Sequence, residues 1–458
     1  MGAPVRAEGG RSASGWLFQG CAMAGVGLAV GLACWPLNAI DRLQDALIGR
    51  FPAFGGSWTL PALLLALAPI ATVPLLLVLQ AGVLHRSAGS GLPQLLEALQ
   101  RPERRDLQLA AGTTAGRLAL WGAASLALLP IGREGPAAQL GAAVAHGLGR
   151  GRLSGELLAA AAGAGLAGAF NTPLMGVIFV AEELSRRFQP NLIWPSLLMA
   201  GVAAEVAGLG GQPLFALGIQ ATPWAEVFQA FWALPVGLGA GLLGALMAKL
   251  LVFGTALILP RARAHPLATG LAVGTALTAL TLISGGQSCG DGETLLRQTL
   301  SLADLGGSGA VALGWTGAAR WGALVVMRLI GPVLALAAGI PGGVIDPAFA
   351  VGGSFGGGLL ELLGGPSGLG VLLGMAAGLA GATQLPVMSL AFAIRITGSQ
   401  QLLPGLLLAA LLGAVVGRWL MPLPLYRALE KLASDQQIQT SKQQLNGDLA
   451  EREVWQKP

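Results

Sequence analysis

The hydrophobic pattern of the chain is a series of long runs without a charged side chain, separated by short breaks rich in glycine and proline. The longest runs cover residues 227–248, 264–290, 362–394 and 396–417. Each run is close to or longer than the ~20 residues that a helix needs to cross the hydrocarbon core of a bilayer. The pattern therefore predicts an all-α polytopic membrane protein.

Composition points the same way. The chain has 458 residues, of which 54% are hydrophobic and only 11% are charged. A soluble domain has about 25% charged residues, so lipid must be the solvent for much of this surface. The 71 glycines and 27 prolines allow helices to approach closely and to break where they line a cavity. The net charge of +5 is explained by loop topology, and the sequence gives no sign of nucleic-acid binding.

Basic residues predict the orientation of the chain. Arg6 and Arg11 precede an uncharged stretch, residues 12–40, that is too long for the apolar core of a signal peptide, so we expect a retained first helix. We expect a cytoplasmic segment at 1–14, a membrane domain at 15–429 and a polar cytoplasmic tail at 430–458. Under the positive-inside rule, further cytoplasmic residues are Arg101, Arg104, Arg105, Arg186 and Arg187.

The second half of the chain repeats the first. Residues 165–179 match residues 378–392 at an offset of 213, with eight of 15 positions identical. Glycine and alanine bias could produce the shared GLAGA block by coincidence, but it would not readily add proline, methionine and phenylalanine in register. An internal repeat is typical of transporters whose site lies between the two halves. We therefore expect inverted repeats at roughly 15–215 and 225–429.

Three glycine-framed segments interrupt the apolar runs. Two of them lie at nearly equivalent places in the repeats, at an offset of 211, and each has a proline suited to a first helical turn. A helix that begins inside the membrane points unpaired N–H groups and a partial positive charge outward, and several such ends can form an anion site. The alternative is a simple small-residue helix contact. The segments are Gly89-Ser90-Gly91-Leu92-Pro93, Gly132-Arg133-Glu134-Gly135-Pro136 and Gly343-Val344-Ile345-Asp346-Pro347.

Two of these side chains suggest chemistry. The Ser90 hydroxyl can donate to an anion while the neighbouring glycines keep the backbone clear. Glu134 is an ionisable group amid uncharged sequence, which makes it a functional-site hypothesis because burial is costly. A carboxylate at a helix N-terminus competes with a transported anion, and protonation removes its attraction. The alternative is that Arg133 and Glu134 only mark a helix start at the membrane edge.

Glu182 and Glu183 end the apolar run at 157–181, just before Arg186 and Arg187. One interpretation is a helix-end cluster with ion pairs three and four residues apart. The other is that one glutamate passes protons from the cytoplasm towards Glu134. The residues themselves leave both interpretations open.

The ordered set of motifs resembles the ClC family of chloride channels and chloride/proton exchangers. The matching parts are GSGLP, GREGP with AAQLGAAVA, AFNTPLMGVIFVAEE and GGVIDP, and the resemblance extends from Gly89 to Tyr426. It implies a ClC-type inverted-repeat fold with broken, tilted helices, of the short prokaryotic type without cytoplasmic nucleotide-binding modules. It also implies a lipid-embedded homodimer with one pathway per subunit, multi-pass in the inner membrane, and no cofactor.

Carried over by position, the resemblance implies that Ser90 coordinates the central anion and that the backbone amides of Val344 and Ile345 complete the site. Glu134 would be the external gating glutamate and Glu183 the internal proton glutamate. Two departures stand out: Ile345 occupies a position that is usually phenylalanine, and the expected inner tyrosine is missing. The only tyrosine, Tyr426, falls later in the chain, so we expect Gln400 to take its place with an amide donor.

We therefore expect secondary active transport of chloride coupled to proton antiport. The alternative within the family is a passive voltage- or pH-gated chloride channel, and Glu183 favours the exchanger. Ser90 within GSGLP disfavours the fluoride-selective relatives. An intramembrane enzyme is a remote alternative, because the three histidines, His85, His146 and His265, form no metal-ligand or HExxH pattern. We expect neither enzyme activity nor a metal site.

Overall fold

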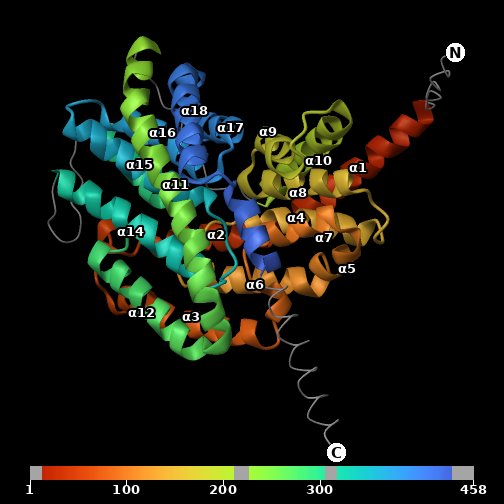
Figure 1. The fold of residues 1–458 in the computed structure, drawn as a ribbon, viewed down its shortest axis with the longest axis horizontal. Coiled ribbons are helices and arrows are strands. Elements are labelled where there is room, and N and C mark those ends of the chain that lie inside the picture. The colour runs from red at the N-terminus through yellow and green to blue at the C-terminus, as the bar shows by residue number, and fades with distance from the viewer. Residues whose placement is uncertain (1–12, 211–225, 305–316, 436–458) are drawn as a thin grey trace, which may run out of the picture.

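The computed structural model describes residues 13–210, 226–304 and 317–435. These residues fold almost entirely into helices, most of them tilted and several of them short (Figure 1). The helices of the first half are α1 (Ala13–Ala33), α2 (Trp35–Ile48), α3 (Leu60–Ala81), α4 (Leu92–Gln100), α5 (Arg105–Gln108), α6 (Ala111–Leu126), α7 (Glu134–Leu148), α8 (Gly155–Phe170), α9 (Pro173–Phe179) and α10 (Pro190–Leu209).

The helices of the second half are α11 (Glu226–Ala264), α12 (Pro266–Ser284), α13 (Glu293–Asp304), α14 (Gly317–Ala337), α15 (Ile345–Leu362), α16 (Ser367–Thr383), α17 (Pro386–Thr397) and α18 (Leu403–Leu420). Residues 425–435 continue as a further helical stretch after α18. Figure 1 shows most of these green-to-blue helices on one side of the molecule and α4 to α10 on the other. Helix α3 crosses to the second group, where it packs against α12.

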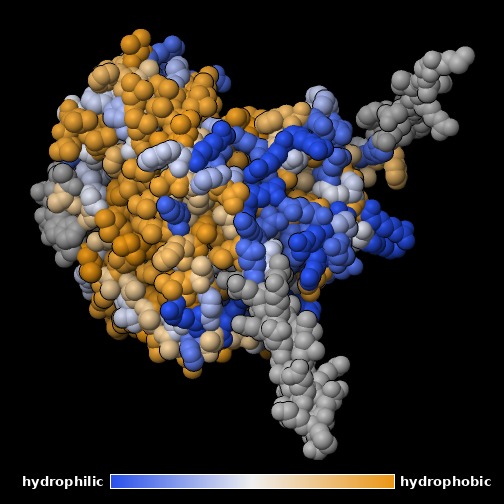
Figure 2. Space-filling view, viewed as in Figure 1, coloured by the Kyte–Doolittle hydropathy of each residue, from blue (hydrophilic) through white to orange (hydrophobic). Residues whose placement is uncertain are grey.

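The surface is that of a membrane protein. Within the described residues, seven helical stretches are long and apolar enough to cross a membrane. Large hydrophobic side chains are exposed on them, among them Leu64, Leu75, Trp194, Phe253 and Trp419. Figure 2 shows hydrophobic residues over much of one face, with hydrophilic residues gathered over the region of α4 and α5.

The apolar run at 362–394 does not form one spanning helix. It folds into α16 and α17, separated by a turn in which Gln384 has a φ of 62°. The first half has the same turn between α8 and α9, where Asn171 has a φ of 50°. In both places a left-handed residue ends one helix and a proline begins the next, which is a common way to break a helix. The breaks lie at the repeat offset that the sequence predicts.

The repeats pack in equivalent ways. Helix α7 packs against α8 as α15 packs against α16, and α8 packs against α10 as α16 packs against α18. At the α15–α16 crossing, a Cβ atom on Gly352 would overlap the carbonyl oxygen of Gly374. Glycine is therefore required there for the backbones to approach so closely. The inverted-repeat fold with broken helices is confirmed.

The basic loops lie at one end of the molecule. The Gln100 side chain donates to Glu430 at 3.4 Å, which joins the end of α4 to the C-terminal stretch 425–435. Arg186 and Glu430 both interact electrostatically with Glu183, so the loop after α9 belongs to the same end. We call this end the basic face. Its position agrees with the expectation that these loops share one side of the membrane.

Candidate anion-binding site

The starts of α7 and α15 meet at the interface of the two repeats. The N–H of Gly132 donates to the carbonyl oxygen of Gly343 at 3.0 Å, and the N–H of Gly343 donates back at 2.9 Å. This two-residue antiparallel bridge joins equivalent positions of the repeats. It places two helix N-termini side by side within the protein, as the offset of 211 predicts.

Glu134 occupies the start of the other repeat's helix. Its side chain is fully buried, and its Oε1 atom accepts a hydrogen bond of 2.9 Å from the N–H of Asp346 in the first turn of α15. A Cβ atom on Gly343 would overlap the Glu134 carboxylate, so glycine at this position leaves room for the carboxylate to lie there. A helix N-terminus attracts anions through its free N–H groups, so the carboxylate lies where an anion would bind.

Ser90 lies against the first turn of α7. Gly89 and Gly91 on either side of it have φ values of 85° and 98°, which side chains rarely tolerate. A Cβ atom on Gly135 would lie 3.2 Å from Ser90 Oγ, so the hydroxyl is next to the residue that follows Glu134. The three glycine-framed segments are thus brought together as the sequence predicts.

Arg117 of α6, which the sequence analysis overlooked, holds the chain just before Ser90. Its buried guanidinium donates to the carbonyl oxygens of Arg86, Ser87 and Ala88 at 3.1–3.2 Å. It also contacts the side chain of Gln139 on α7. A single arginine within an apolar helix was the available signal, because such a charge needs internal partners.

A cavity of about 320 Å³ extends from this region towards the basic face. Ser90, Gly343, Val344 and Tyr426 line it at the helix starts. Arg86, Arg263 and Glu430 line it along with residues of the C-terminal stretch 425–435. Small-molecule sites have this concave form with a few polar groups among apolar ones.

The structure contradicts the expectation that Gln400 takes the place of the inner tyrosine. Gln400 is exposed at the start of a short turn before α18, and it does not line the cavity. Tyr426 does line it, with only 2% of the side chain exposed, and within the described residues its hydroxyl has no hydrogen-bond partner. The reason is topological: α18 separates Gln400 from Tyr426 along the chain, and the stretch 425–435 reaches the cavity that Ser90 also lines. Sequence order alone does not show that arrangement.

The two glutamates at the end of α9 have different surroundings. Residues 180–184 form a π-helical turn, which is wider than a turn of α-helix, so its side chains are spaced differently around the helix axis. Glu182 accepts hydrogen bonds from the N–H groups of Val387 and Met388 at 3.2 and 2.8 Å, and so caps α17. Glu183 is fully buried, and both of its carboxylate oxygens lack a hydrogen-bond partner among the described residues. The charged groups that interact with it electrostatically are Arg427, Arg186, Glu182 and Glu430.

Arg395 stands at the place in the second repeat that Glu182 has in the first. Its exposed guanidinium donates to the carbonyl oxygen of Asn171, where α8 ends, at 3.4 Å. Glu182 therefore binds the start of a second-repeat helix, and Arg395 binds the end of a first-repeat helix. The two residues join the repeats across α9 and α17.

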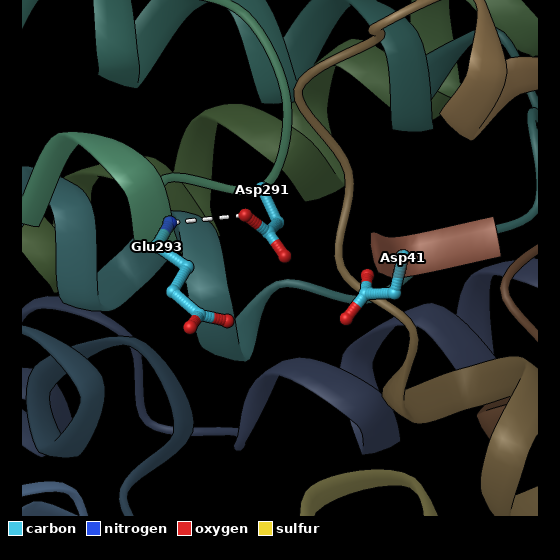
Figure 3. Close-up of side chains that lie close together, drawn as sticks. All are labelled: Asp41, Asp291 and Glu293. Carbon is cyan, nitrogen blue, oxygen red and sulfur yellow. Dashed lines mark hydrogen bonds between the residues drawn. The ribbon is translucent and has the colours of Figure 1, made fainter. Parts of the chain in front are cut away.

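Arg133 and Glu134 do not pair with each other in the described part of the chain. Arg133 is buried over the ring of Phe170, 4.4 Å from its centroid, and its guanidinium contacts Asp41 and lies 3.9 Å from Glu293. Figure 3 shows the side chains of Asp41, Asp291 and Glu293 close together. The backbone N–H of Glu293 donates a hydrogen bond to the Asp291 carboxylate. Their carboxylate oxygens lie within 4.8 Å of one another. The Arg133 guanidinium supplies a positive charge to Asp41 and Glu293, so these side chains form a buried ion-pair network.

Comparisons with known proteins agree with this geometry. The family described as Voltage gated chloride channel matches residues 70–418. The chain is 28% identical over 396 residues to the H(+)/Cl(-) exchange transporter ClcA of Cronobacter sakazakii, covering 77% of both chains. It is 29% identical over 309 residues to the voltage-gated ClC-type chloride channel ClcB of Salmonella typhimurium, covering 65% of this chain and 71% of that one.

Solved structures share the fold. A CLC-type fluoride/proton antiporter superposes with a TM-score of 0.70 at 23% identity, covering 92% of this chain and 99% of that one. A slow cyanobacterial Cl-/H+ antiporter gives a TM-score of 0.69 at 22% identity, with 90% and 97% covered. Inverted repeats, broken helices and converging helix starts define a multi-pass membrane transport protein. The chain belongs to the voltage-gated chloride channel (ClC) family, whose members are channels and transporters and not enzymes.

Arg133→Met should destabilise the protein because it leaves the buried Asp41 carboxylate without the guanidinium that contacts it, whereas Glu293 keeps its ion pair with Arg297. Breaking a buried ion pair in this way costs about 3–5 kcal/mol. The expected result is a clear drop in the thermal unfolding midpoint of the purified protein in detergent. Asp41→Asn in the same chain should restore part of the loss. Equal midpoints for the wild type and Arg133→Met would contradict the network.

Proposed function

We propose that this protein exchanges chloride for protons in opposite directions across the membrane. The observation that carries the proposal is the Glu134 carboxylate, bound to the N–H of Asp346 at the start of α15. One site at the repeat interface can then hold either a protein carboxylate or an anion. The similarity to a relative described as an H(+)/Cl(-) exchange transporter supports the choice of ions.

In the proposed cycle, chloride reaches the site through the cavity from the basic face. The Ser90 hydroxyl and the N–H groups of Val344 and Ile345 hold the anion, and the Tyr426 hydroxyl takes the role that we expected of Gln400. Glu134 blocks the site when ionised. Once protonated it loses its attraction to the helix start, swings aside and lets chloride pass.

Protons are proposed to enter from the basic face through Glu183. That carboxylate is buried without a hydrogen-bond partner in the described residues, which is costly unless it takes up a proton. Tyr426 interacts electrostatically with both Glu183 and Glu134, which supports a proton path that passes near its hydroxyl. In this proposal, the proton path and the anion path both pass Glu134, and they separate on the side towards the basic face.

A passive chloride channel is the second candidate, favoured by the relative described as a chloride channel. A channel has no need for a buried proton acceptor such as Glu183, and that residue favours exchange. We also propose a homodimer in the lipid of a prokaryotic inner membrane, with one pathway in each subunit. The bacterial origin of both relatives supports the membrane assignment.

Reconstituted liposomes test the exchange directly. An imposed chloride gradient should drive protons uphill into or out of the vesicles, because each turnover moves both ions in opposite directions. Chloride movement is followed with an electrode and proton movement with external pH. Glu183→Gln should retain chloride flux but lower proton movement by roughly tenfold or more, because the amide cannot accept the proton.

Glu182→Gln is the matched control. Its amide oxygen can still accept hydrogen bonds from the start of α17, so both fluxes should stay near the wild-type values. Chloride movement without proton movement in the wild type would exclude the exchanger and leave the channel. Loss of coupling in Glu182→Gln but not in Glu183→Gln would exchange the proposed roles.

Glu134→Gln should separate the two ions. The uncharged side chain no longer binds strongly to the start of α15 and carries no proton, so chloride should flow without uphill proton movement. The same liposome assay measures both ions. Proton coupling that survives in Glu134→Gln would show that another residue is the gate.

Tyr426→Phe tests the revised inner end of the site. Removing a hydroxyl that donates to an anion should weaken chloride binding by roughly tenfold, because a hydrogen bond to a charged group contributes about 1.5–3 kcal/mol. Isothermal titration of detergent-purified protein measures the dissociation constant. Gln400→Ala should leave it unchanged, and the reverse pattern would restore Gln400 to the site.

A further inference from the structure

Asp346 is a second buried carboxyl group at the gate. It lies in the first turn of α15, and its side chain is fully buried. Its backbone N–H binds the Glu134 carboxylate at 2.9 Å, but both of its own carboxylate oxygens lack a hydrogen-bond partner in the described part of the chain. The equivalent residue of the first repeat is Gly135, so the repeat architecture does not require an acid at this position.

The groups that face Asp346 are mostly negative. Glu134 of α7, Asp291 just before α13 and Glu293 at its start interact with it electrostatically, and so does Tyr426 of the C-terminal stretch 425–435. Arg133 is the guanidinium that faces it, and this group already contacts Asp41.

The other helices packed on α15 do not compensate this charge. The Arg328 guanidinium of α14 is committed to the carbonyl oxygens of Cys289 and Gly290, at 2.7 and 2.8 Å. Helix α16 has no ionisable side chain, and Lys249 of α11 is exposed.

An ionised carboxylate without hydrogen bonds costs several kcal/mol in such a place. Two buried carboxylates that interact electrostatically also disfavour each other's charge. A chloride ion that enters after Glu134 has been protonated would again place a negative charge at the start of α15, beside Asp346. Each of these effects favours the neutral, protonated form of Asp346.

We propose that Asp346 is a second proton-binding group of the gate, and that it takes up a proton when chloride binds at the start of α15. The step is a proton transfer from water to a carboxylate oxygen, which gives a neutral carboxyl group beside the anion. The inference rests on the anion site proposed above. It assigns the gate two exchangeable protons, one on Glu134 and one on Asp346.

Linkage makes the proposal measurable. If chloride binding draws a proton onto Asp346, then a lower pH must strengthen chloride binding by the same free energy. Glu134 obscures this effect in the wild type because it competes for the same site. The Glu134→Gln variant removes that competitor and leaves Asp346 as the acid beside the bound anion.

The test is chloride titration calorimetry of the full chain in detergent, between about pH 5 and pH 8. Glu134→Gln should bind chloride roughly tenfold more tightly at the acid end, which corresponds to a coupling free energy of about 1.4 kcal/mol between chloride and the proton. Glu134→Gln with Asp346→Asn should bind chloride with the same affinity at every pH. As a matched control, Glu134→Gln with Asp45→Asn should keep the pH dependence, because the Asp45 carboxylate is bound to Thr294 and Arg297.

A second measurement needs no double variant. Titrations of Glu134→Gln in buffers of different ionisation enthalpy report the protons taken up per chloride bound, and the expected number is clearly above zero near neutral pH. Chloride binding without proton uptake, or equal pH dependence with and without Asp346→Asn, would overturn the inference alone. Absence of chloride binding at every pH would overturn the proposed anion site and the inference with it.

Discussion

The free N–H groups at the start of α15 are the constraint on which the rest of the site depends. A helix that begins inside the membrane leaves these groups without water, so the protein must supply an acceptor. The acceptor here is the Glu134 carboxylate from the other repeat. The Gly132–Gly343 bridge holds the two helix starts together, and glycine at 343 leaves room for the carboxylate. In the proposed mechanism, the contact that joins the repeats is also the contact that an anion replaces.

In the described part of the chain, the buried charged side chains fall into two groups, those with a hydrogen-bond or ion-pair partner and those without one. Arg117 binds three carbonyl oxygens, Arg133 contacts Asp41, and Glu182 caps α17. Each of these groups has a polar or charged partner in another element, and so holds elements in place. The carboxylates of Glu183 and Asp346 have no hydrogen-bond partner in the described residues. Because burial penalises an unpartnered charge, these are the groups suited to gain and lose protons.

The two repeats share their backbone plan but differ in side chains, and function depends on the differences. Glu134 has Ile345 as its counterpart, and Asp346 has Gly135. An exact repeat would place two equivalent helix starts opposite each other with no preference between them. The acid on α7 and the N–H groups on α15 make the pair directional. Glu182 and Arg395 likewise bind opposite kinds of helix end across α9 and α17.

The sequence by itself determined the membrane class, the repeat, the helix breaks and the glycine-framed segments that meet at Ser90 and Glu134. These are local properties, because hydropathy, glycine and proline act on their own stretch of chain. The tertiary structure decided which distant residues complete the site. It placed Tyr426, and not Gln400, at the cavity, gave Glu182 and Glu183 different surroundings, and left the buried Asp346 carboxylate without a hydrogen-bond partner among the described residues. Burial and partners depend on contacts between remote segments, which spacing along the chain does not encode.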